Sequence, residues 1–170
     1  MLRFAPALAL ALCPTVASAD LAIRFVESAP KDRFVIVNQG ACALGETELT
    51  IDLSSSAAGL IFDVTGQGAG VEVFQPLELV AGADLVRAIS DVADGDATVT
   101  LTLAQMAPNA QVAFTVDVDD TAPASSLGQI RVAGSEIEGA TATLTSQDSA
   151  VRAVFSNRAA LELPGAPCLS

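Results

Sequence analysis

The sequence contains no histidine, no tryptophan and no tyrosine, and Lys31 is its single lysine. Without histidine there is no imidazole to act as the general base of a Ser-His-Asp triad, and none to bind a metal. Without tryptophan and tyrosine the chain lacks the rings on which many glycan sites and interfaces depend. These absences remove most of the usual catalytic residues, and we predict no catalytic residue and a non-enzymatic role.

Positive charge is also scarce, since 8 Lys and Arg face 20 Asp and Glu, for a formal net charge of −12. Nucleic acids and anionic lipid surfaces are polyanions that require basic partners, so the composition argues against both. Cations, basic proteins and neutral glycans remain compatible with this charge.

The first nineteen residues have the pattern of a signal peptide. Arg3 gives a basic start, residues 5–12 are apolar, and Ala17-Ser18-Ala19 is the small-residue pattern of a cleavage site. The apolar stretch is shorter than the ~20 residues that a membrane-spanning helix needs. We therefore predict cleavage between Ala19 and Asp20, export to the periplasm or the cell exterior, and no membrane insertion of the mature chain.

Cleavage would remove Cys13 and leave two cysteines, Cys42 and Cys168. An even pair in an exported protein is most simply a disulfide, here between Cys42 and Cys168. Two free thiols are the alternative.

Short runs with alternating apolar and polar residues follow one another along the chain, separated by Gly, Pro, Asn and Asp. About ten strands with no long amphipathic helix predict an all-β fold, a single antiparallel β-sandwich of the jelly-roll or immunoglobulin-like type over 20–170. Segment 85–93 would also suit a short helix, and we interpret it as a strand. The predicted strands are 21–27, 33–38, 46–54, 59–65, 70–80, 85–93, 97–103, 110–119, 128–134, 136–146 and 150–156.

The stretch "FTVDVDDT" (114–121) places Asp117, Asp119 and Asp120 within four positions. Alternation directs Val116 and Val118 inward, so Asp117 and Asp119 are expected on the solvent side, with Asp120 starting a loop. Calcium takes six to eight oxygen ligands, which carboxylates at a strand end can supply in part.

A second segment would have to complete the shell, and Glu136, Glu138 and the acidic loop 91–96 are candidates, with Glu136 included in the predicted set. A solvated acidic loop without a metal is the alternative for residues 117–120. The "ADGD" sequence within 91–96 does not fit an EF-hand loop and indicates a tight turn.

Three stretches resemble the short exported bacterial proteins of the "aggregation factor core" family: "DLAIRFVESAPKDRFVIVNQGACALG", "SAAGLIFDVTGQGAGVEVFQPLELVAG" and "FTVDVDDTAPASSLGQIRVAGSEIEGA". The family takes its name from the core protein of a sponge adhesion proteoglycan that acts in calcium-dependent cell adhesion. The resemblance implies an extracellular β-domain that depends on calcium and has no catalytic activity.

Together these observations predict an exported binding or adhesion domain, assisted by calcium, whose partner is an extracellular protein or glycan. A hydrolase that uses carboxylates or a serine from 53–59 or 121–128 is one alternative. A structural envelope protein without an ion site is the other.

Overall fold

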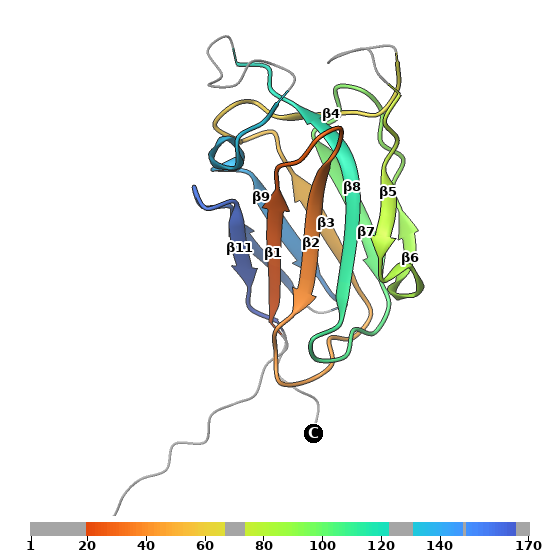
Figure 1. The fold of residues 1–170 in the computed structure, drawn as a ribbon. Coiled ribbons are helices and arrows are strands. Elements are labelled where there is room, and N and C mark those ends of the chain that lie inside the picture. The colour runs from red at the N-terminus through yellow and green to blue at the C-terminus, as the bar shows by residue number, and fades with distance from the viewer. Residues whose placement is uncertain (1–19, 67–73, 123–130, 148, 166–170) are drawn as a thin grey trace, which may run out of the picture.

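The computed structural model describes residues 20–66, 74–122, 131–147 and 149–165. Two antiparallel sheets pack face to face in this part of the chain, as Figure 1 shows. The predicted all-β sandwich is therefore confirmed. None of the described helices is long and apolar enough to cross a membrane.

In the first sheet, strand β8 pairs with β2 along one of its edges. Along its other edge it pairs with two short strands, β4 and β5. Because β4 and β5 pair with different parts of β8, neither strand runs along its whole length. The strands in order are β11 (Ala160–Leu163), β1 (Leu21–Val26), β2 (Asp32–Asn38), β8 (Gln111–Asp119) and β4 (Ile61–Asp63), with β5 (Glu78–Ala81) also on β8.

The second sheet lies behind the first in Figure 1. Its order is β10 (Ala150–Val154), β9 (Thr141–Thr145), β3 (Thr47–Asp52), β7 (Thr98–Leu103) and β6 (Val86–Ile89). The 3-10 turn η1 (Ala83–Leu85) leads from β5 in one sheet to β6 in the other, and a second turn, η2 (Gly134–Ile137), precedes β9.

Period-two alternation builds the core between the sheets. In β7, Val99, Leu101 and Leu103 are fully buried, whereas Thr98, Thr100 and Thr102 lie on the other face. In the first sheet, the Phe34 ring lies 5.0 Å from the Phe114 ring and 5.1 Å from the Phe25 ring. Such contacts add to the apolar burial that holds the layers together.

Most predicted strands are present, including β6 within the ambiguous segment 85–93. The prediction was wrong for 131–134, which forms no strand, and within 70–80 the described residues are extended only in β5. Strand β11 was not predicted, because "ALEL" is too short to stand out from the preceding run. It forms by pairing with β1.

The structure describes only one of the two cysteines of the predicted disulfide. Cys42 packs against the core and is disulfide-bonded, whereas Cys168 lies outside the described residues. Pairing of Cys42 with Cys168 therefore stays a prediction. The predicted signal peptide, residues 1–19, also lies outside the described residues.

Candidate functional site

Acidic side chains gather where β8 ends. Asp63 in β4 lies directly opposite Asp117 in β8, and Asp119 lies opposite Ile61 two residues further along β8. Directly opposed residues of antiparallel strands have Cβ atoms about 4.5–5.5 Å apart, and like charges in this arrangement are destabilising. The register thus places carboxylates side by side at a cost in free energy.

Five aspartates at this end are buried, and we call them the aspartate cluster: Asp32, Asp63, Asp117, Asp119 and Asp120. The prediction that Asp117 and Asp119 face solvent was wrong, since their exposed fractions are 7% and 2%. The alternation itself is correct, because Val116 and Val118 point into the core. The outer face of the sheet is covered at this point.

Lys31 provides part of that cover. It precedes β2 on one side of β8, and its Nζ donates to the Pro76 carbonyl (3.1 Å) and to Glu78 Oε2 (2.6 Å) on the other side. Glu78 is paired with Thr115, which lies on the same outer face of β8 as Asp117. Lys31 therefore reaches across the outer face of β8, beside the aspartate cluster.

Burial, together with the neighbouring Asp119 and Asp63 carboxylates, raises the pKa of Asp117 to about 6, against the opposing effect of Lys31. Near neutral pH this carboxyl is partly protonated, so its environment favours the neutral form. A cation at this position would reverse that preference by stabilising the charged carboxylate.

Asp32 extends the cluster across β8 from the start of β2, where it pairs with Val116. Burial raises the pKa of Asp32 to about 7, with a smaller contribution from the Asp117 carboxylate. Hydrogen bonds from the backbone N–H groups of Ser28 and Val118 act in the opposite direction, since they favour the carboxylate. The Ser28 N–H donates to Asp32 Oδ1 at 3.0 Å.

Asp120 follows directly after β8. Its side chain is only 2% exposed, and neither carboxylate oxygen accepts a hydrogen bond from any residue that the structure describes. A buried carboxylate without donors is costly, because its desolvation is not offset. This group has the environment expected of a ligand to a cation.

Glu136, the fourth predicted ligand, has a local role. Its Oε2 accepts a hydrogen bond from the backbone N–H of Ala133 (2.6 Å), which caps η2. The chain around it lies near the end of β8, because Ala58 N–H donates to the Glu136 carbonyl and Thr121 N–H donates to the Ala58 carbonyl. The side chain itself is thus engaged with the backbone of its own turn.

The acidic loop 91–96 braces β4. Asp94 Oδ1 accepts hydrogen bonds from the backbone N–H groups of Val64 and Thr65, both at 2.8 Å, directly after Asp63. Asp96 N–H donates to the Ala93 carbonyl (3.0 Å) and Gly95 has a positive φ of 86°, which confirms the predicted tight turn. Asp94 thus holds the end of β4, whereas Asp96 Oδ2 accepts a hydrogen bond from Ala93 N–H within the loop.

The sequence pointed to Asp117, Asp119 and Asp120, which the structure brings together with two aspartates that we did not predict. Asp32 and Asp63 belong to the cluster only because β2 and β4 flank β8, a pairing that local alternation does not reveal. Over the described ranges, no three acidic or cysteine side chains are already arranged to hold a metal ion. Uptake of a cation would therefore require the carboxylates to rotate toward one another.

No protein-family model matches this chain, and no curated protein or solved structure is significantly similar to it.

The bond between Lys31 and Pro76 gives a test of how this end is held. We expect Lys31→Met to lower the free energy of unfolding by about 1.5–3 kcal/mol, the range for a hydrogen bond to a charged group, because it removes that bond and exposes Asp117 to uncompensated repulsion. Glu78→Gln, which loses only an exposed ion pair, should cost about 0.2–1 kcal/mol. Urea unfolding of both variants measures the difference, and equal losses would contradict the anchoring role.

Proposed function

We propose that this protein is an exported, non-catalytic binding domain of the adhesion type, whose aspartate cluster takes up calcium. The observation that carries this proposal is Asp120, a buried carboxylate that accepts no hydrogen bond from the described residues and directly follows the buried Asp119 at the end of β8. The five side chains of the cluster offer carboxylate oxygens, which suit a hard cation such as Ca²⁺.

Asp117, Asp119 and Asp120 would provide the first ligands, with Asp63 from the neighbouring strand. A bound cation would offset the repulsion between the opposed Asp63 and Asp117 and hold the end of β8 against β4. In this way calcium would stiffen the end of the sandwich that meets an extracellular protein or glycan. Glu136 would join only if its side chain left the Ala133 N–H.

The burial of these carboxylates also supports a binding role over hydrolysis. A general acid or base must reach the substrate to within a hydrogen bond or one water. With exposed fractions of 1% for Asp63 and 7% for Asp117, this opposed pair does not meet that condition.

Thermal unfolding in calcium and in a chelator tests the proposal. At a free calcium concentration 100 times the Kd, a single site adds about 2.7 kcal/mol, which corresponds to a rise in Tm of about 5–10 °C for a chain of this size. We expect magnesium at the same concentration to give a smaller rise, because Mg²⁺ demands a strict octahedral shell and gives up its water reluctantly.

Asp120→Asn should abolish the calcium-dependent rise. Asp84→Asn, which removes the same charge from an exposed position in η1, should leave it unchanged. No rise in the wild-type protein, or equal rises with calcium and magnesium, would leave a structural module without a specific calcium site.

A further inference from the structure

Two arginines lie on the outer face of β1 and β2, and a third lies in the turn before β11. Leu21, Ile23 and Phe25 point into the core, so Arg24 between them points outward. Arg33 lies diagonally across from Arg24 on the same face of β2, since it pairs with Val26. The chain as a whole is acidic, with 20 acidic and 8 basic residues, so neighbouring arginines on one face stand out from the overall negative charge.

Arg158 reaches this face from the turn before β11. The turn is fixed by hydrogen bonds from Ala159 N–H to the Ser156 carbonyl (3.0 Å) and from Ser156 Oγ to the Ala160 carbonyl (3.0 Å). Ala159 has a positive φ of 55°, and its carbonyl accepts from Phe25 N–H at 2.9 Å. These contacts hold Arg158 beside β1, although 134 positions separate it from Arg24 (158 minus 24).

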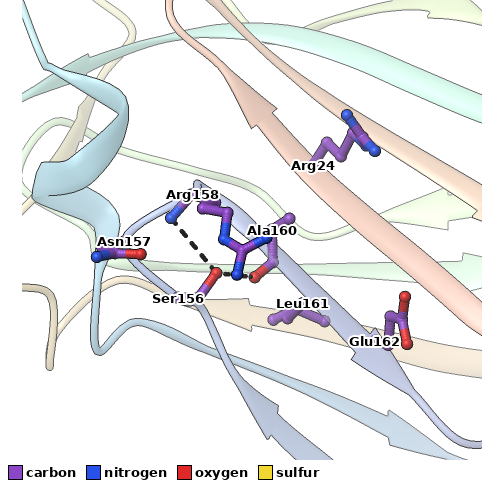
Figure 2. Close-up of a pocket in the computed structure, with 7 residues that line it drawn as sticks. All are labelled: Arg24, Ser156, Asn157, Arg158, Ala160, Leu161 and Glu162. Atoms are coloured by element: carbon purple, nitrogen blue, oxygen red, sulfur yellow. Dashed lines mark hydrogen bonds between the residues drawn. The ribbon is translucent and has the colours of Figure 1, made fainter.

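A hollow of about 510 Å³ lies between the turn and the two strands. Figure 2 shows Ser156, Asn157 and Arg158 on one side of it, with Arg24 and Glu162 on the other. The volume lies in the range of small-molecule sites. Its lining residues are Arg24, Ser156, Asn157, Arg158, Ala160, Leu161 and Glu162.

The arginines of this hollow are available to a ligand. The ion pair found in the described part of the chain joins Lys31 to Glu78 and involves neither Arg24 nor Arg158. Both side chains are exposed, although acids outnumber bases by more than two to one. Guanidinium groups bind carboxylate and sulfate through paired, charge-assisted hydrogen bonds.

The other polar groups narrow the class of ligand. Glu162, when ionised, only accepts hydrogen bonds, so it repels a second anionic group and favours a hydroxyl. The Asn157 amide can donate to or accept from a hydroxyl as well. A long polyanion would also meet the repulsion of the net charge of −12.

We propose that the hollow between the Ser156–Ala159 turn and β1 binds a saccharide unit that carries one carboxylate or sulfate group. Arg24 and Arg158 bind the anionic group, and Glu162 and Asn157 bind the sugar hydroxyls. The site contains no residue of the aspartate cluster, so a test of saccharide binding is independent of whether the protein binds calcium.

Titration calorimetry of the mature protein, in a chelator, tests this site with three disaccharides of equal size: one with a uronate, one with a single sulfate and one neutral. We expect binding of a charged disaccharide, weakened by salt, and none of the neutral one. The stronger of the two charged disaccharides identifies the anionic group.

Arg24→Gln and Arg158→Gln should each weaken that binding about tenfold, as expected for loss of a charge-assisted hydrogen bond. Arg87→Gln is the charge-matched control, because Arg87 is exposed in β6 of the other sheet, and it should change the Kd less than twofold. Equal effects of all three substitutions, or no binding of either charged disaccharide, would overturn the site.

Glu162→Gln separates a saccharide site from a general anion site. It should strengthen binding of inorganic sulfate, by removing a negative charge, and weaken binding of the disaccharide, by removing a hydroxyl acceptor. Disaccharide binding that rises in parallel with sulfate binding would overturn the saccharide assignment, as would tighter binding of an acidic peptide than of either charged disaccharide.

Discussion

In the absence of divalent cations, Asp32 is expected to destabilise the folded protein by up to about 4 kcal/mol at pH 8 relative to pH 4. Burial raises the pKa of Asp32 from 3.8 to about 7, and each unit corresponds to about 1.4 kcal/mol. A carboxyl whose pKa is higher in the folded state holds its proton more tightly there than in the unfolded chain. Its stabilising contribution is complete below pH 4 and is lost as the pH rises through about 7.

Asp32→Asn isolates this contribution, because asparagine can still accept the Ser28 N–H without a charge. We expect the difference in unfolding free energy between the variant and the wild type to grow in favour of the variant from pH 4 to pH 8. Urea unfolding across this range measures it. Asp84→Asn, at an exposed position, is the control and should show no such trend.

If the aspartate cluster takes up calcium as proposed, calcium should reverse part of this behaviour, because it would bind the ionised carboxylates. Asp117, with a pKa of about 6, is partly protonated at pH 5.5, so protons compete with the cation there. The calcium-dependent rise in Tm should therefore be larger at pH 8 than at pH 5.5. A rise that is equal at both pH values would mean that calcium binds away from Asp117.

The second large effect is expected at Cys42, which is disulfide-bonded. A bridge to Cys168 would close about 125 residues and stabilise the fold by about 4–5 kcal/mol through the lost entropy of the unfolded chain. Cys42→Ser should remove this amount under oxidising conditions, and Cys168→Ser should remove the same.

The double variant Cys42→Ser with Cys168→Ser provides the control, because both substitutions break one bond and their effects should not add. A reducing agent should lower the Tm of the wild type and leave the double variant unchanged. If Cys168→Ser alone had no effect on oxidised protein, Cys168 would not be the partner of Cys42.

Much of the fold follows from local alternation, and β7 shows why. Its threonines and its aliphatic residues separate cleanly onto two faces, so one face must meet another sheet. Segment 131–134 had a similar local pattern but forms no strand, since extended residues need a neighbouring ladder to become part of a sheet.

The aspartate cluster was only partly predictable for the same reason. Alternation placed Asp117 and Asp119 on one face of β8. Whether that face is exposed to solvent depends on distant residues such as Lys31, which lies 86 positions before Asp117 (117 minus 31). Asp63 faces Asp117 only through the register of β4 on β8. The proximity of these carboxylates is a property of tertiary pairing and has no signature in any single segment.

The change of neighbours along β8 has a dynamic consequence. Its first half is flanked by β2 and β5, whereas its last residues are held on one side by three residue pairs with β4. Local opening at this short ladder can proceed while the long ladder between β2 and β8 stays closed. We therefore expect the tip of the sandwich to open locally more often than the rest of the sheet, without global unfolding.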